Sequence, residues 1–318
     1  MEFVLCHIYF VYLLCNDIKH IPNSIKKAME NIASILERVK NINYANGINA
    51  RGFKNGGNSV SVYKIISTLN EPFDAVAMSE KMSLRDYDNP SGKYYGQTAE
   101  EIRAMWNEMG ERSMAIGRKV DLTIQRFFSS MTFPSPSIET QREIFESAVR
   151  AINVGEFAKE YGKDYLGHVN SFFEFIRILD GHDWELMGTE VPMHDPNSGI
   201  LGRADCILRQ GERLVLIDWK TNKDISTTNS FQNMLGPMLG YESTKLNEFT
   251  MQIYLYVWMM RNVYGITDRI DPIIVKLNES LDGVNPQPPT ILKPMIPYSD
   301  ELVVDVINHA LFTLGNQM

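Results

Sequence analysis

The chain contains 318 residues, of which 44% are hydrophobic, 10% aromatic and 22% charged. This is the composition of a globular protein, and it excludes disordered, collagen-like and coiled-coil classes. The 31 lysines and arginines are outnumbered by 39 acidic residues. The resulting net charge of −8 excludes a uniformly basic nucleic-acid-binding surface but allows a local basic groove.

The cysteines are too few and too scattered for a structural framework. Cys6, Cys15 and Cys206 form no CxxC pair. This pattern excludes a disulfide scaffold, a zinc knuckle and a cysteine-ligated iron–sulfur cluster. It favours an intracellular, reducing compartment.

Residues 3–15, FVLCHIYFVYLLC, are almost entirely apolar. As a helix this segment would rise about 20 Å, which is shorter than the roughly 30 Å hydrocarbon core of a bilayer. Only Met1 and Glu2 precede it, and no small-residue cleavage site follows, which disfavours a signal peptide. We expect a buried strand or helix and no stable membrane association. Membrane attachment and a signal peptide are the alternatives.

The next segment predicts an amphipathic helix over residues 22–40, whose apolar positions recur at helical spacing. An Asn- and Gly-rich stretch follows and is typical of a linker that ends near Ser59. We therefore expect an N-terminal appendage over residues 1–58 and a single domain over residues 59–318.

The domain is predicted to alternate helices and strands. A capping box, Thr98 to Glu101, starts a helix over 98–128, which Gly110 and Gly117 could bend. Apolar periodicity predicts further helices at 138–153, 166–179, 247–262 and from about 299 to 314. Alternation predicts strands at 185–193, 200–208, 213–220 and 270–277. The order helix, three strands, helix, strand indicates an α/β fold.

The hairpin between the second and third predicted strands contains the candidate catalytic residues. Its turn falls at residues 210–213, where Gly211 can adopt positive φ at the first central position of a type II′ turn. In a two-residue hairpin the numbers of opposite residues add to a constant, which places Asp205 opposite Asp218, with Cβ atoms about 5 Å apart. The period of two puts Lys220 on the same face.

Two facing carboxylates repel each other, and burying them without a partner is costly. A divalent cation such as Mg²⁺ would bind both, and Lys220 could orient or deprotonate an attacking water and stabilise charge on a phosphorane. The alternative is an exposed Asp–Lys pair beside a solvated aspartate.

These residues resemble the motifs of the PD-(D/E)XK nuclease superfamily, in particular its RecB-like exonuclease branch. The motif GxxD is represented by Gly202–Asp205, and (D/E)xK by Asp218–Lys220. The motif QxxxY is represented by Gln252–Tyr256, and Glu190 matches a glutamate on the first core strand. The likeness covers roughly residues 60–277.

The resemblance implies a restriction-endonuclease-like αβββαβ core, a mixed sheet flanked by helices, with helical insertions. It implies a Mg²⁺- or Mn²⁺-dependent DNA exonuclease of recombination, repair or replication. The implied catalytic residues are Lys220, Asp205, Asp218, Glu190 and Gln252. The metal would be bound by Asp205, Asp218 and the backbone carbonyl of Trp219, and the substrate by Thr221 and Tyr256. For Tyr256 an ordinary core position is the alternative.

The family's RecB-like members carry G-T-x-x-H-x-x-x-E on an upstream helix, where the His binds metal. Here Asp121 replaces the His and Gln125 replaces the Glu, after Gly117. Aspartate can bind Mg²⁺ or Mn²⁺, so the resemblance implies that Asp121 completes the metal site, with attenuated catalysis. A helix-surface charge is the alternative for Asp121.

Two segments, FDAVAMSEKM and YYGQTAEEIRAMW, resemble RecB-like nucleases of large DNA viruses and phages that lack an iron–sulfur cluster. This likeness implies a viral or phage protein, located in a host cytoplasm or nucleus. Its partners would be single-stranded DNA or duplex ends, and a helicase or recombinase.

Other basic residues are candidates for phosphate contacts. Arg118 and Lys119, with Arg112 and Arg126, outnumber Asp121, the single acid between Arg112 and Arg126. A solvated helix face is the alternative.

The polar loop 221–246 contains Lys223, Phe231 and Lys245 and could clamp a strand; a disordered loop is the alternative. The sequence lacks HxH, HExxH, GxSxG, GxGxxG and Walker A motifs, which disfavours zinc hydrolases, serine esterases, dinucleotide enzymes and NTPases. Two rivals to the exonuclease are an endonuclease of the same fold and a catalytically weak DNA-binding or recombination partner.

Overall fold

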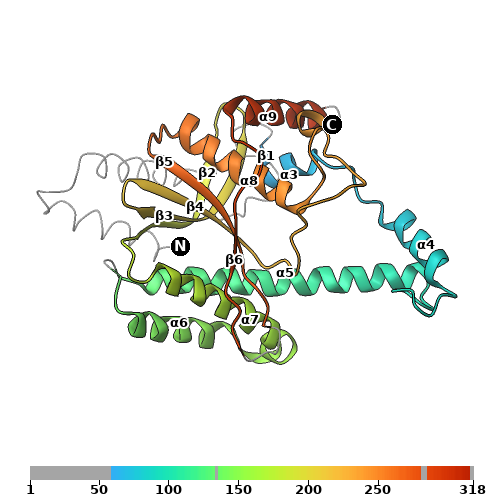
Figure 1. Cartoon of the computed structure of the whole chain (residues 1–318), viewed down its shortest axis with the longest axis horizontal. Helices are drawn as coiled ribbons and strands as arrows, with labels where there is room; N and C mark the ends of the chain where they lie inside the picture. Colours follow the sequence, from blue (N-terminus) through green and yellow to red (C-terminus); the bar gives the residue numbers. More distant parts are fainter. Residues whose placement is uncertain (1–58, 133–134, 281–284, 316–318) are drawn as a thin grey trace, which may run out of the picture.

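A six-stranded mixed sheet lies between two layers of helices in the computed structural model, which describes residues 59–132, 135–280 and 285–315 (Figure 1). The strand order is β1-β3-β4-β5-β6, and β2 pairs with the other edge of β3. The strands are β1 (Val60–Ser61), β2 (Glu185–His194), β3 (Ile200–Gln210), β4 (Arg213–Lys220), β5 (Arg269–Lys276) and β6 (Thr290–Leu292).

The core of the sheet follows the predicted order. Strands β2, β3 and β4 are antiparallel, and β5 lies parallel to β4 after the helix α8 (Lys245–Trp258). With α7 (Gly155–Leu179) before β2, the sequence of elements is helix, three strands, helix, strand. The predicted α/β fold with this core is confirmed.

Two hydrophobic cores cover the two faces of the sheet. One joins the sheet to α3 (Val62–Ser67), α8 and α9 (Asp300–Gly315). The other joins it to α5 (Ala99–Ser130), α6 (Ile138–Ile152) and α7. Successive strand residues alternate between them: Leu216 contributes to the first core and Ile217 to the second. This is the alternation that the pleat of a strand imposes.

The long helix α5 begins at the predicted capping box. The Thr98 hydroxyl accepts from Glu101 N–H at 3.3 Å, and the Glu101 carboxylate accepts from Thr98 N–H at 2.7 Å. Its second half packs into the core, but no residue between Ile102 and Ile116 is buried. This first half extends past the sheet, and α4 (Ala75–Asp86) lies against it (Figure 1).

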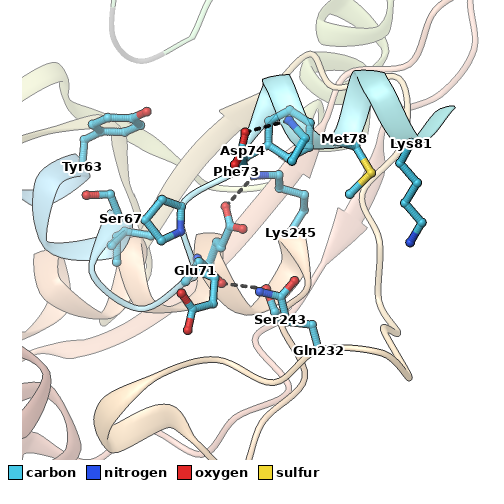
Figure 2. A pocket seen from close by; sticks show the side chains of 15 residues that line it. Tyr63, Ser67, Glu71, Phe73, Asp74, Met78, Lys81, Gln232, Ser243 and Lys245 are labelled. Carbon is cyan, nitrogen blue, oxygen red and sulfur yellow. Dashed lines mark hydrogen bonds and ion pairs between the residues drawn. The ribbon is translucent and has the colours of Figure 1, made fainter. Parts of the chain in front are cut away.

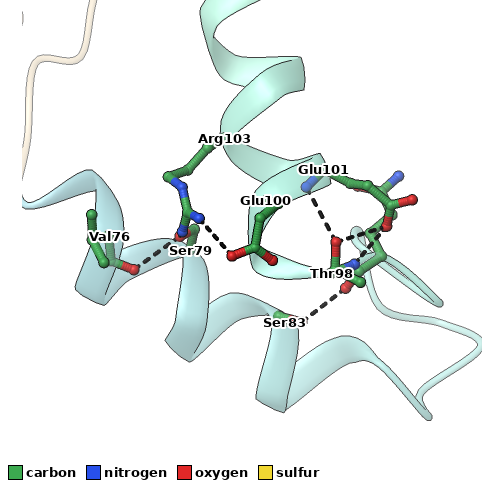
Figure 3. A network of polar contacts seen from close by, with 8 residues as sticks. Val76, Ser79, Ser83, Thr98, Glu100, Glu101 and Arg103 are labelled. Atoms are coloured by element: carbon green, nitrogen blue, oxygen red, sulfur yellow. Dashed lines mark hydrogen bonds and ion pairs between the residues drawn. The ribbon is translucent and has the colours of Figure 1, made fainter.

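Polar contacts rather than a hydrophobic core join α4 to α5 (Figure 3). The two residues that α4 buries, Ser79 and Asp86, are both polar. The Arg103 guanidinium donates to Ser79 Oγ at 2.7 Å, and Ser83 Oγ donates to the Gln97 carbonyl at 2.8 Å. Helix α4 buries no apolar stripe, and it was not predicted.

Three other predictions need correction. Helix α7 begins at Gly155, eleven residues before the predicted start at 166. The short elements β1, α3 and β6 were not predicted. The loop between β4 and α8 is not disordered: it contains a 3-10 turn, η2 (Gly236–Met238), and it buries Met234 and Met238 in the core.

The predictions for residues 1–58, namely the apolar segment, the helix over 22–40 and the linker, lie outside the described residues. Among the described ranges, no helix combines the length and the apolar composition that crossing a bilayer requires.

Candidate active site

The turn that organises the site forms as predicted. Gly211 has a φ of +58°, whereas the next residue, Glu212, has a negative φ, and this combination is that of a type II′ turn. Gln210 pairs with Arg213, and the same register continues to Cys206 and Ile217. The predicted register of the hairpin is therefore confirmed.

Asp205 and Asp218 lie one residue beyond the last paired residues, where the ladder between β3 and β4 ends. Near its start β3 pairs with β1 at Leu201, and β2 already occupies the other edge there. Strand β1 thus pairs with the first residues of the same β3 edge that pairs with β4 further along β3. At this junction the Asp205 carboxylate accepts a hydrogen bond from Trp219 N–H at 2.8 Å, which fixes its orientation.

The Asp218 carboxylate is only 2% exposed. Its Oδ2 lies 2.7 Å from the Lys220 ammonium, and its Oδ1 accepts no hydrogen bond from any described residue. Burial raises the pKa of Asp218. Burial, followed by the charge of Asp218, raises the pKa of Asp205 well above its usual range. The two carboxylates therefore lie where additional positive charge would stabilise them.

Lys220 is held by three neighbours. Besides Asp218, its Nζ donates to Gln252 Oε1 at 3.2 Å and lies 4.4 Å from the centroid of the Phe249 ring. Burial lowers the pKa of Lys220, but the charges of Asp218 and Asp205 outweigh it, and the net pKa is raised. Lys220 is consequently a cation in this arrangement, which suits charge stabilisation better than proton abstraction.

Tyr256 lies beneath the site rather than on its surface. Its side chain is 5% exposed, and a Cβ built on Gly202 would lie 2.6 Å from Tyr256 Cε1 and 2.9 Å from Val62 Cγ2. The ring therefore occupies the space that the missing side chain leaves. The GxxD and QxxxY segments of this chain are therefore in direct contact. The predicted substrate-binding role does not fit a buried ring, and the core alternative does.

Helix α5 brings Asp121 to the same cluster. Burial raises the pKa of Asp121 to about 6, the charges of Glu190 and Asp218 add to this, and Lys220 opposes it. One turn earlier, a Cβ on Gly117 would lie 3.3 Å from Thr221 Oγ1, so the helix approaches the end of β4 closely. Asp121 is therefore part of the electrostatic environment of Asp218 and not an isolated surface charge.

Glu190 on β2 has a φ of +50°, the one positive value among the described non-glycine residues. The register that pairs Thr189 with Cys206 and Val191 with Ala204 places Glu190 across from Asp205. Its carboxylate accepts from Arg203 at 2.8 Å. A left-handed conformation inside a strand is strained, and such strain clusters at functional sites.

Comparison with known protein families identifies the family of this chain. The family model described as the PD-(D/E)XK nuclease superfamily matches residues 82–313. This chain belongs to the PD-(D/E)XK nuclease superfamily. No curated protein matches it.

Two solved structures resemble this superfamily member at 15% sequence identity. One is SSO0001, with a TM-score of 0.23, covering 61% of this chain and 74% of that one. The other is a protein from Eubacterium rectale described as a candidate exonuclease, with a TM-score of 0.29, covering 77% of this chain and 82% of that one. The RecB-like viral branch stays a prediction.

Nucleases of this superfamily generally use divalent metal ions, and the donors present here fit one. Asp205 and Asp218 supply two carboxylates, and Asp218 Oδ1 lacks a hydrogen bond. Within the described ranges, no three His, Cys, Asp or Glu side chains form a complete cage. Mg²⁺ requires only one or two carboxylates when waters and substrate phosphate complete its coordination. Ligation by Asp121 and by the Trp219 carbonyl remains a prediction.

The basic residues of α5 point in different directions. Lys119 lies with its ammonium 5.4 Å from the centroid of the Phe157 ring on α7, and Arg112 forms a 2.5 Å ion pair with Asp164 on the same helix. These two side chains therefore join α5 to α7. Substrate binding by Lys119 stays a prediction. Arg118 is exposed and stays a candidate.

Phe249, which contacts Lys220, was not among the predicted site residues. Its signal was available: Phe249 precedes Gln252 by three residues and therefore shares its face of α8. Arg203, the partner of Glu190, was also missed although it lies inside the GxxD motif.

Proposed function

We propose that this protein is a divalent-metal-dependent deoxyribonuclease that hydrolyses phosphodiester bonds from DNA ends, in recombination, repair or replication. The observation that carries the proposal is the buried pair of Asp218 and Lys220 at 2.7 Å, beside Asp205. Family membership supports the hydrolysis of nucleic acid. A helicase or recombinase would supply the ends.

Each residue has a role that its contacts support. Asp205 and Asp218 would hold Mg²⁺ or Mn²⁺, which when bound supplies an electrophile and a water of lowered pKa. Trp219 N–H keeps the Asp205 carboxylate in place. Lys220, positioned by Gln252, would stabilise the negative charge that develops on the phosphate oxygens in the transition state.

A catalytically weak DNA-binding protein is the second candidate, favoured by one observation. Asp121 stands where relatives have a metal-binding His, and the pKa of Asp121 is raised to about 6. Below that pKa the carboxyl is protonated and has to release a proton before it can bind a cation. This candidate predicts binding of DNA without turnover.

A digestion time course separates the candidates. Linear single-stranded and duplex DNA, labelled at the 5′ or the 3′ end, and a covalently closed circle would be incubated with Mg²⁺, Mn²⁺ or EDTA. An exonuclease shortens the linear DNA from an end and leaves the circle intact, whereas an endonuclease opens the circle. DNA that is bound but never cleaved would contradict the nuclease proposal.

A matched pair of variants shows whether the observed cleavage belongs to this site. Lys220→Met should abolish it. Lys293→Met should not, because Lys293 lines a different pocket, together with Gln210 and Arg213, and none of the candidate active-site residues lines it. If both variants lose cleavage equally, or if neither loses it, the activity belongs to another site or to a contaminant.

A further inference from the structure

A groove of about 680 Å³ opens between α3, α4 and the start of α8 (Figure 2). Its volume lies within the range of about 300–1,000 Å³ that is typical of ligand sites. The residues that matter for what it could bind are Tyr63, Phe73, Asn70, Gln232, Ser243 and Lys245.

Two aromatic rings line this groove with their surfaces open to solvent. Tyr63 on α3 is 82% exposed, and Phe73 before α4 is 67% exposed. The Phe73 ring is also supported from behind, since its centroid lies 5.7 Å from that of Trp106, whose indole N–H donates to the Tyr94 hydroxyl at 3.0 Å. A ring held in this way offers a face for stacking with little loss of conformational entropy on binding.

One side of α8 connects the groove to the candidate active site. Lys245 and Glu248 line the groove, and Gln252, one turn beyond Glu248, contacts Lys220. Four residues of helix rise about 6 Å. Stacked nucleotides of one strand are about 3.4 Å apart. A strand that lies beside Glu248 would therefore reach Gln252, the hydrogen-bond partner of Lys220, within about two nucleotides.

The charge of the groove favours contacts with bases over contacts with phosphates. Its ionisable residues are Glu71, Asp74 and Glu248 against Lys81 and Lys245, and Lys245 is already paired with Glu248 at 2.7 Å. Attraction of phosphate therefore cannot explain binding here. The faces of bases are hidden in a stacked duplex and are accessible only where the strand is unpaired.

We propose that this groove binds one or two unpaired nucleotides of the DNA strand that enters the active site, with their bases stacked on Tyr63 and Phe73. The proposal rests on the proposed nuclease function and adds to it a substrate class: single strands, or duplex ends that fray before cleavage.

Equilibrium binding in EDTA, where the metal-dependent reaction cannot occur, tests the proposal. The probes are a fluorescein-labelled oligothymidylate, a blunt duplex of equal length, and a single strand containing 2-aminopurine, whose fluorescence falls when the base stacks. Tyr63→Ala and Phe73→Ala should each weaken single-strand binding about tenfold and reduce the 2-aminopurine quenching. Tyr63→Phe should retain both. Phe312→Ala is the matched control, because Phe312 on α9 is 72% exposed but does not line the groove.

Several results would overturn the groove as a nucleotide site. One is that the wild-type protein does not bind the single strand, or binds it no more tightly than the duplex. Another is that the alanine variants bind the single strand within twofold of wild type, as expected if the groove holds a peptide. Tyr63→Ala decides the matter even if Phe73→Ala disturbs α4, because the exposed Tyr63 ring contributes little to packing. If the protein cleaves DNA and both alanine variants bind normally, the nuclease proposal stands and the groove proposal is wrong. If binding depends on the two rings but no DNA is cleaved, the groove proposal stands and the nuclease proposal is wrong.

Discussion

Replacing Gly202 by Ala is expected to damage both stability and activity through Tyr256. The new Cβ would lie 2.6 Å from Tyr256 Cε1, about 1 Å inside a normal carbon–carbon contact. Overpacking of this kind costs about 1–3 kcal/mol. At about 2–4 °C per kcal/mol for a domain of this order of size, the melting temperature should fall by about 2–12 °C. Since Asp205 follows three residues later on β3, a shift of the strand should also lower cleavage.

A double-mutant cycle isolates the contact. Tyr256→Leu removes the ring that the Cβ would meet, so Gly202→Ala should cost at least about 1 kcal/mol less in that background. Urea unfolding measures the free energies of all four proteins. Gly110→Ala is the matched control: no atom lies within 4 Å of its Cβ on α5, and it should stabilise the helix by about 0.5–1 kcal/mol.

Opposite signs for the two glycine substitutions are therefore the central expectation. A neutral or stabilising Gly202→Ala would contradict the expected clash, and so would two changes in the cycle that add within about 0.5 kcal/mol. In either case the Tyr256 ring would not be what excludes a side chain at position 202.

The remaining predictions concern the charges of the site. Asp218→Asn should abolish most of the rise in melting temperature on adding Mg²⁺, which for a hundredfold excess over Kd corresponds to about 2.7 kcal/mol. Lys220→Met should lower kcat more than tenfold in single-turnover cleavage, because its ammonium acts on charge that develops in the transition state. Asp121→Asn should stabilise the metal-free protein above pH 6 by about 1–3 kcal/mol in urea unfolding. Asp121 has a pKa of about 6 when folded and about 3.8 when unfolded, so wild-type stability falls as pH rises between these values.

Each of these has a result that contradicts it. An unchanged metal-induced shift in Asp218→Asn would remove that carboxylate from the metal site. More than a tenth of wild-type turnover in Lys220→Met would remove the lysine from the chemistry. A stabilisation by Asp121→Asn that does not grow between pH 4 and pH 6 would show that Asp121 ionises normally. Asp305→Asn, an exposed carboxylate on α9, is the control for general charge effects.

The hairpin and its carboxylates were predictable because the information is local. Gly211 fixes the turn, the turn fixes the register, and the period of two then places Asp205, Asp218 and Lys220 on one face. No distant residue has to be known for this reasoning. The order of the larger helices and strands was predictable for the same reason, since each buries a periodic apolar face.

The contacts that could not be predicted join distant parts of the chain. Tyr256 is buried because it packs on Gly202, and Lys119 faces Phe157 on another helix. Neither contact leaves a trace in the local sequence. The groove was missed because the exposure of Tyr63 and Phe73 follows from the position of α4, a helix held by polar bonds.

The electrostatics of the site connect its stability to its occupancy. Burial raises the pKa of Asp205, Asp218 and Asp121, and Lys220 is the cation in direct contact with Asp218. Ionising all three carboxylates thus opposes folding, and any cation that binds there recovers that free energy. A neutral His in place of Asp121 would reduce both the opposition to folding and the free energy that a bound cation recovers. Having Asp rather than His at position 121 therefore lowers the stability of the metal-free protein and makes folding depend more strongly on the metal, whether or not Asp121 itself becomes a ligand.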